Sequence, residues 1–348
     1  MIPNRINQLD PRLVNQIAAG EIIERPASIV KELIENALDA GATRIDIDVE
    51  MAGIKRIKIT DNGHGILKQD LSMALSRHAT SKIASMSDLE QIATLGFRGE
   101  ALPSIASVTR LTIQSKEQNS DQAWMVTSDG NNKINETEPV AHPLGTTIEA
   151  RDLFYNTPAR RKFLRTESTE YKHLDQLVRR MALSRFDVEF KLSHNGRVKL
   201  HLPSAASDDS RRIKAVCGDN VPDNSIYFEE QRPGLRLYGW LGLPSFSRSQ
   251  ADMQYFYLNG RLIKDKTVTH AVRLGYRDVL FHGRQPIYVL YLEMDPAGVD
   301  VNVHPTKHEV RFRESREIHG FIFRSIQSQL SVSAGESNSL QLDSESGM

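Results

Sequence analysis

Cysteine is almost absent from this sequence of 348 residues, which contains only Cys217. A single cysteine excludes an internal disulfide bond and any zinc site built from several cysteines. The sequence also lacks an apolar run of about 18 residues, the length that a membrane-spanning helix needs. Its first residues, MIPNRINQLDPR, are too polar for a secretory signal peptide. We therefore expect a cytoplasmic protein.

An excess of charge of either sign is missing as well, because 44 Lys and Arg residues balance 44 Asp and Glu residues. The distribution along the chain is nevertheless uneven. Residues 151–185 contain nine basic and four acidic side chains, and residues 258–284 contain six and two. Such segments can form a local phosphate-binding surface, although ordinary solvated helix faces would have the same composition.

The length exceeds the roughly 250–300 residues at which a single hydrophobic core usually stops growing, so we expect two domains. The polar stretch PSAASDDS, residues 203–210, has no periodicity and separates them. We assign residues 1–204 to the first domain and residues 211–331 to a smaller second one. Residues 332–348 are rich in serine and lack Lys and Arg, which predicts the start of a flexible linker.

Local patterns predict an α/β (α+β layered) fold, with helices on a mixed, largely antiparallel sheet. Asp10-Pro11 and Pro26 are typical helix starts, and Gly41 is a typical helix end. Asn195-Gly196 is typical of a tight hairpin turn. Strands are expected near residues 45–49, 57–59, 111–115, 123–128, 146–150, 236–240, 254–258 and 287–293. Further helices are expected up to about residue 96, from residue 100, and over residues 168–184, 265–276 and 316–328.

The predicted helix that begins at Pro26 carries a row of polar side chains. At about 100° per residue, Glu32, Asn36 and Asp39 share one side, opposite an apolar stripe. A solvated helix face would look the same, so this row alone does not define a site.

Three glycine-containing stretches could complete a nucleotide site, although the common signature G-x-x-x-x-G-K-[ST] is missing. In DNGHG, Asp61 ends a predicted strand, and its carboxylate could accept a hydrogen bond from the amine of a base. In GFRGE, residues 96–100, glycines flank an arginine where a helix begins, which favours an anion. GTT, residues 145–147, could close the base pocket with a hydroxyl group. Each stretch alone is a weak signal.

The order of the motifs is more specific than any one of them. ELIENALDAG, DNGHGI, RHATSK, LGFRGEAL and GTT follow one another as in the GHKL ATPases, the superfamily of gyrase B, heat-shock chaperone ATPases and histidine kinases. Longer blocks, including NQIAAGEIIERPASIVKEL, GFRGEALPSIASV, DLFYNTPARRKFL and DVNVHPTKHEVRF, resemble the MutL family of DNA mismatch-repair proteins. The resemblance runs from about Ile6 to Leu330. It implies a GHKL-type ATPase sandwich followed by a smaller α/β domain like ribosomal protein S5.

The resemblance also implies roles for individual residues around ATP and Mg²⁺. Glu32 would be the general base that activates water, and Asn36 would ligate Mg²⁺ through its amide oxygen. Asp61 would bind the adenine amino group, with Gly65 and Thr146 lining that pocket. A lid over the phosphates would be formed by Thr80, Ser81, Lys82, Gly96, Phe97, Arg98, Gly99, Glu100 and Ala101. Asp39 receives no role, and a merely solvated position remains open for it.

Lys307 in the second domain would be the other catalytic contact, reaching the γ-phosphate with its flexible, charged side chain. His304, His308 and Glu309 surround it and could suggest a metal site, but a structural role is the alternative that we favour.

As implied by the family, slow ATP hydrolysis would control lid closure, an ATP-dependent homodimer and non-specific binding of single- or double-stranded DNA. Partners would be the mismatch-recognition protein MutS and a downstream nuclease and helicase. Candidate DNA contacts are Arg160, Arg161, Lys162, Arg261, Lys264, Lys266 and Arg273. Family members end in a dimerisation domain, which in some carries a metal-dependent endonuclease.

Two other functions remain open from the sequence. A related ATPase, such as a topoisomerase subunit or a chaperone, would share the nucleotide motifs but not the FYNTPARRKFL and HPTKHEVRF blocks. A DNA-binding scaffold without enzymatic activity would be expected to have degenerate motifs, whereas Glu32, Asn36, Asp61 and Lys82 are intact.

Overall fold

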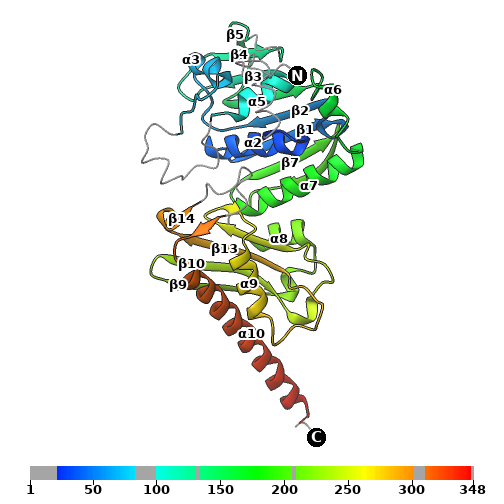
Figure 1. The fold of residues 1–348 in the computed structure, drawn as a ribbon, viewed down its shortest axis with the longest axis vertical. Helices are drawn as coiled ribbons and strands as arrows, with labels where there is room; N and C mark the ends of the chain where they lie inside the picture. Colours follow the sequence, from blue (N-terminus) through cyan, green and yellow to red (C-terminus); the bar gives the residue numbers. More distant parts are fainter. Residues whose placement is uncertain (1–21, 83–98, 131–133, 206–208, 301–309, 346–348) are drawn as a thin grey trace, which may run out of the picture. The chain divides into compact units, whose positions relative to one another are not determined.

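The computed structural model describes residues 22–82, 99–130, 134–205, 209–300 and 310–345. The chain divides into two compact units, Met1–Ser207 and Asp208–Met348. Both units combine helices with a sheet (Figure 1). The helix expected at Asp10 lies outside the described residues.

An eight-stranded sheet forms the centre of the N-terminal unit, in the order β5-β4-β3-β6-β2-β1-β7-β8. The strands are β1 (Arg44–Glu50), β2 (Arg56–Asp61), β3 (Arg110–Lys116), β4 (Ala123–Ser128), β5 (Glu138–Val140), β6 (Gly145–Arg151), β7 (Glu189–His194) and β8 (Arg197–Leu202). Neighbouring strands run antiparallel except β1 and β7, which are parallel. The largely antiparallel mixed sheet is therefore confirmed.

Helices α2 (Pro26–Asp39), α5 (Ala101–Val108) and α7 (Glu167–Ser184) lie over this sheet in Figure 1. Proline stands at the start of α2, where a missing N–H costs nothing. Gly41 ends the helix with φ +72°, and its N–H donates to Leu38 O at 3.0 Å. Both predicted helix signals are confirmed. The core between α2 and the sheet consists of fully buried side chains, among them Ile29, Val30, Leu33, Ile34, Ile45, Ile47, Val49 and Ile57.

The helix expected up to Gly96 is confirmed only in part over the residues that the structure describes. Between β2 and residue 76 the helical elements are a short helix, α3 (Lys68–Leu71), and a 3-10 turn, Met73–Leu75. His78 has φ +58°, a left-handed conformation that cannot continue a right-handed helix. The sequence also did not predict β5 or the four-residue helix α6 (Pro158–Arg161), both too short for a periodic pattern.

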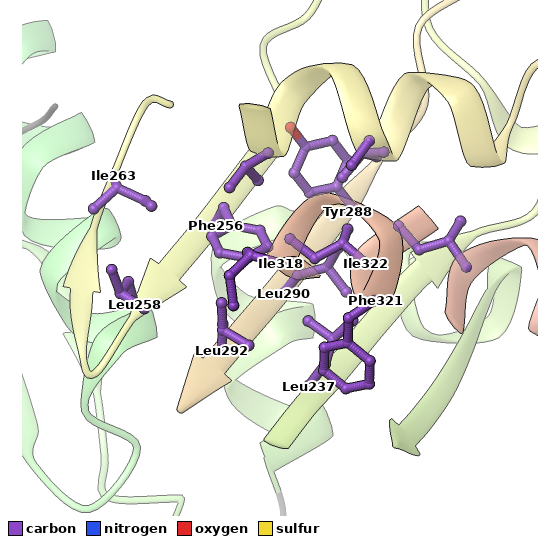
Figure 2. Packing of buried hydrophobic residues seen from close by; sticks show 14 of the residues in the cluster. Leu237, Phe256, Leu258, Ile263, Tyr288, Leu290, Leu292, Ile318, Phe321 and Ile322 are labelled. Atoms are coloured by element: carbon purple, nitrogen blue, oxygen red, sulfur yellow. The ribbon is translucent and has the colours of Figure 1, made fainter. Parts of the chain in front are cut away.

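The C-terminal unit contains a five-stranded sheet in the order β12-β11-β13-β10-β9. Its main strands are β9 (Ser225–Arg232), β10 (Leu235–Gly242), β11 (Gln254–Leu258), β12 (Arg261–Leu262) and β13 (Tyr288–Met294), and a separate two-stranded ladder pairs β14 (Val299–Asp300) with β15 (Arg311–Phe312). Its helices are α8 (Asp209–Cys217), α9 (Lys266–Gly275) and α10 (Ser315–Glu345). Figure 2 shows α10 residues Ile318, Phe321 and Ile322 packed with sheet residues such as Leu237 and Leu290 in one buried cluster.

Helix α10 continues to Glu345, although the composition predicts a flexible linker from residue 332. Its first half is anchored by buried side chains up to Leu330. Extending an existing helix adds one hydrogen bond per residue and avoids the cost of nucleation, so a polar sequence without proline can continue it. Within the described residues, no helix is long and apolar enough to cross a membrane.

Candidate nucleotide site

The polar row of α2 contacts a segment more than forty residues further along the chain. Lys82 Nζ donates to Asn36 Oδ1 at 2.9 Å and forms an ion pair with Asp39 Oδ2 at 2.5 Å. The Asp39 side chain is only 9% exposed, so the solvated alternative for this residue is wrong. The two oxygens together hold one positive charge at the end of α2. This contact also places Thr80 and Ser81, which are exposed, near the same helix.

Glu32 lies one turn earlier on α2 and is less constrained. Its side chain is 22% exposed, and among the described residues it pairs only with Lys31 Nζ at 3.7 Å, a distance too long for a strong hydrogen bond. Lys31 also approaches Glu35 at 3.4 Å. The Glu32 carboxylate therefore remains accessible to a water molecule.

Asp61 is the last residue of β2 and lies opposite Thr146 in the register with β6. Its Oδ1 accepts a hydrogen bond from Gly63 N at 2.9 Å. Burial raises the pKa of Asp61 to about 6, while backbone N–H groups of Gly63 and Thr146 and the nearby His64 act in the opposite direction. A carboxylate that is poorly hydrated but ionised at neutral pH is a strong acceptor for an amine.

The DNGHG turn fits closely against the end of α2 and the neighbouring strands. His64 N donates to Ala40 O at 3.0 Å, which fastens the turn to the residue after α2. Gly65 has φ +77°, and a Cβ at this position would lie 2.1 Å from Lys116 O. A Cβ at Gly63 would lie 2.7 Å from Ala40 O. These positions require glycine because the backbones approach too closely for any side chain.

Thr146 is buried, and its hydroxyl lies 2.9 Å from the hydroxyl of Ser115. Ser115 Oγ is also 3.1 Å from Gly145 O and accepts from Ile66 N at 2.8 Å. Ser115 thus joins two predicted parts of the site, the GTT stretch and the end of the DNGHG turn, although no motif in the sequence predicted it. A signal was present, because Ser115 occupies the same side of β3 as the buried Leu111 and Ile113.

Two of the predicted lid segments lie next to each other. Gly99 has φ +64°, and a Cβ there would lie 2.5 Å from Ala79 O, beside Thr80. Glu100 directly precedes α5 without a side-chain capping hydrogen bond, and its Oε1 lies 3.6 Å from His78 Nδ1. Ala101 is the first residue of α5. Gly96, Phe97, Arg98 and Lys307, together with His304, His308 and Glu309, lie outside the described residues.

The predicted DNA contacts occur in two separate places. On and after α6, Arg161 and Lys162 are exposed, whereas Arg160 is half-buried. In the C-terminal unit Lys264, Lys266 and Arg273 are exposed, and Arg261 is half-buried on β12. Asp265 caps α9 by accepting from Val268 N at 3.0 Å, which fixes the helix that carries Lys266 and Arg273.

Comparison with known proteins identifies the class of the N-terminal unit first. Residues 24–154 match the family described as histidine kinase-, DNA gyrase B- and HSP90-like ATPases. The fold of the chain resembles the Aquifex aeolicus MutL ATPase domain complexed with ADP, with a TM-score of 0.60 and 29% identity over 79% of this chain and 94% of that one. It also resembles the N-terminal domain of a DNA repair protein, with a TM-score of 0.76 at 23% identity over 92% and 98% of the two chains. The N-terminal unit is a GHKL-type ATPase domain.

The second half of the chain identifies the protein family. Residues 213–331 match the C-terminal domain of DNA mismatch repair proteins. The DNA mismatch repair protein MutL of Pseudomonas syringae pv. tomato is 58% identical over 94% of this chain and 51% of its own length, and that of Azotobacter vinelandii is 59% identical over 93% and 51%. The chain belongs to the MutL family of DNA mismatch repair proteins and spans about half the length of these relatives. The predicted family and fold class are confirmed.

Proposed function

We propose that this chain binds ATP in its N-terminal unit and hydrolyses it slowly, as a nucleotide-dependent switch in DNA mismatch repair. The observation that carries this proposal is the fastening of the DNGHG turn to Ala40, at the end of α2. Through that contact the half-buried Asp61 carboxylate and the polar row of α2 border one region. Asp61, as the acceptor for the base, and the polar side chains of α2, as the hydrolytic groups, would then contact the same small ligand.

Asp61 would accept a hydrogen bond from the adenine amine. Gly63 and Gly65 would let the flat base lie against the backbone, since neither carries a side chain. Thr146 and Ser115 would fix the far side of this pocket. The similar Aquifex aeolicus ATPase domain was solved with ADP, which supports a nucleotide as the ligand.

Glu32 would act as the general base, because its carboxylate is accessible and only loosely paired. The oxygens of Asn36 and Asp39 already accept one cationic group, the Lys82 ammonium, so their chemistry fits a cation. Mg²⁺ held through the Asn36 amide oxygen would supply positive charge against the phosphates. Lys82 would then shift from the α2 row toward the phosphates together with Thr80 and Ser81.

Gly99–Ala101 and the segment at Ala79 and Thr80 would move together as a lid, since they already pack against each other. Lid closure would create the surface for an ATP-dependent homodimer, and Lys307 would complete the phosphate site. In the cell, the switch would couple MutS-dependent mismatch recognition to a nuclease and a helicase. DNA would be bound non-specifically through the basic segments of both units.

The test is Mg²⁺-dependent ATP turnover together with direct nucleotide binding for the wild type and Glu32→Ala. We expect Glu32→Ala to bind ATP normally but to lose turnover by about 100-fold or more, the usual contribution of a general base. Glu138→Ala, which removes an exposed carboxylate on β5, serves as the matched control. Wild-type turnover equal to that of Glu32→Ala would favour the non-enzymatic scaffold.

Dimerisation is tested by light scattering with a non-hydrolysable ATP analogue. The analogue should shift the chain from monomer to dimer, and turnover per chain should rise with protein concentration. An unchanged mass across the accessible concentrations would remove the dimer from the proposal.

A further inference from the structure

The turn at α6 carries a dense positive charge. Residues 158–165, PARRKFLR, contain four basic side chains and no acidic one. Arg161, Lys162 and Arg165 are exposed, and among the described residues their side chains form no ion pair. The charge at this turn is therefore available to an external partner.

The acidic residues that follow the turn do not neutralise it. Glu167 Oε1 accepts from Asn195 Nδ2 at 2.9 Å and lies 3.1 Å from His194 Nε2. Glu170 is buried, and its Oε1 accepts from the backbone N–H of Arg165 at 3.0 Å. Both carboxylates hold the start of α7, and their two negative charges do not balance the four basic side chains of residues 158–165, so this region stays net positive.

An aromatic ring stands in the middle of this charge. Phe163 is 83% exposed, more than any other large hydrophobic side chain among the described residues. The backbone holds it there, because Phe163 N donates to Arg160 O at 2.9 Å and Lys162 N donates to Pro158 O at 3.3 Å. This turn thus leaves a large apolar side chain in solvent, and the fold does not gain the free energy of burying it.

A second exposed phenylalanine provides a contrast. Phe281, on the loop after α9, is 78% exposed. Its basic neighbours are engaged, since Arg277 Nε lies 3.4 Å from Asp278 Oδ1, and Arg284 donates to the carbonyl and hydroxyl oxygens of Ser247. Exposure of a ring is common to both sites, whereas three exposed basic side chains without an ion pair among the described residues lie beside Phe163.

We propose that Phe163 is a base-stacking residue, and that the α6 turn binds an unpaired nucleic-acid strand with Arg161, Lys162 and Arg165 on its phosphates. Unpaired bases stack on exposed aromatic rings, and cations beside the ring follow the backbone. In a duplex the bases are stacked on one another, so the ring would find no partner there. A protein surface would need to be strongly acidic to match this turn. The inference rests on the proposed DNA binding and specifies which nucleic acid this turn selects.

The experiment measures fluorescence anisotropy of labelled oligo(dT) and of a labelled duplex at low salt, with the full chain. Phe163→Ala should weaken oligo(dT) binding by about tenfold, within the range for loss of one stacked base, and duplex binding by less than about twofold. Phe163→Trp should keep wild-type affinity, and its fluorescence should be quenched on binding. Phe281→Ala is the matched control and should change neither affinity.

Equal losses on oligo(dT) and duplex in Phe163→Ala would overturn the stacking role, as would wild-type affinity for oligo(dT). If Phe163→Ala instead lowers the solution mass in the presence of an ATP analogue and leaves oligo(dT) affinity unchanged, the ring contacts a second copy and the proposal is wrong. A wild type that binds neither probe refutes the proposed DNA binding as well. If Phe163→Ala does not show the expected loss of oligo(dT) affinity, the stacking proposal is wrong but the proposed ATP switch is unaffected.

Discussion

In the N-terminal unit the polar side chains of the candidate site contact one another, whereas the basic side chains singled out in the C-terminal unit extend from the surface. Asn36, Asp39 and Lys82 share hydrogen bonds, and Ser115 joins Thr146 to the turn at Gly65. By contrast, Lys264, Lys266 and Arg273 are exposed. A preorganised set of groups suits a ligand of fixed shape. Exposed cations suit a polyanion that is bound through charge alone.

Two glycines, one in each unit, show a similar difference in how closely another backbone segment approaches them. Gly65 in the N-terminal unit and Gly283 in the C-terminal unit have the same φ, +77°. A Cβ at Gly65 would lie 2.1 Å from Lys116 O, whereas a Cβ at Gly283 would meet nothing within 4 Å. The conformation alone therefore does not mark a site; the close approach of another backbone does.

The largest expected effect is a loss of stability in Gly65→Ala, which is compared with the loss in Gly283→Ala. Gly283→Ala should cost about 1–2 kcal/mol, the penalty for a left-handed alanine. Gly65→Ala should cost about 4 kcal/mol or more in the N-terminal unit, because a backbone segment must also move. Urea unfolding followed by tryptophan fluorescence measures this, since Trp124 reports on the N-terminal unit and Trp240 on the other. Removing either tryptophan by substitution with phenylalanine isolates the remaining signal. Equal costs would remove the structural distinction between the two glycines.

Asp61→Asn should give the next largest effect and should act on binding and stability in opposite directions. Nucleotide affinity should fall by about 30-fold or more, because an amide can present a donor to the adenine amine and leave it without an acceptor. The N-terminal unit should become more stable by roughly 1–3 kcal/mol at pH 7.

The sign follows from the pKa of Asp61, which the fold raises from its ordinary value to about 6. A raised carboxyl pKa means that ionisation disfavours the folded state, at a cost that grows from about pH 4 to about pH 6 and is fully present at pH 7. Asparagine removes this cost. Calorimetric binding and urea unfolding provide the two measurements, with the exposed Asp121→Asn as control. A variant that loses both affinity and stability would show that Asp61 is structural.

The distance along the chain between interacting residues explains which features could be predicted from the sequence. Pro26 and Gly41 act on their own neighbours, so the ends of α2 were predictable, as was the hairpin at Asn195 and Gly196, where φ is +50° and +74°. Asp61 stood out because two glycines, Gly63 and Gly65, lie within the next four residues. Local chemistry of this kind is visible in a single sequence.

Contacts between distant segments were not predictable from periodicity. Lys82 meets Asp39 across 43 positions, a pairing that depends on how the chain folds back after α3. Ser115 resembled any strand serine until its neighbours were known. Both contacts join elements whose separate patterns are ordinary.

The third prediction concerns charge in the C-terminal unit. Arg273→Glu should weaken DNA binding by about tenfold near 0.1 M salt and lower the slope of log affinity against log salt by about 0.9 for duplex DNA, or about 0.7 for single strands. Basal ATPase should stay near wild type, and any stimulation of it by DNA should disappear. Arg316→Glu on α10 changes the net charge equally and serves as control. An unchanged salt slope for Arg273→Glu would show that α9 is not the DNA surface.

The smallest expected effect is the pH dependence of nucleotide binding, which should be specific to the N-terminal unit. Because burial raises the pKa of Asp61 to about 6, lowering the pH through this value replaces the carboxylate by a carboxyl group that donates as well as accepts. Affinity for ATP at about pH 5.5 should therefore be roughly a quarter of that at pH 8, since about a quarter of the groups remain ionised. The terminal phosphate of the nucleotide also titrates, with a pKa of about 6.

Asp61→Asn separates the two contributions, because it keeps the phosphate titration and removes that of the carboxylate. The ratio of wild-type to variant affinity should thus fall about fourfold from pH 8 to about pH 5.5. DNA binding through Arg273 does not involve the Asp61 carboxylate and should lack this component. A ratio that does not change with pH would mean that the Asp61 carboxylate does not contact the base. The preorganised acceptor of the N-terminal unit would then have to be Ser115 or Thr146.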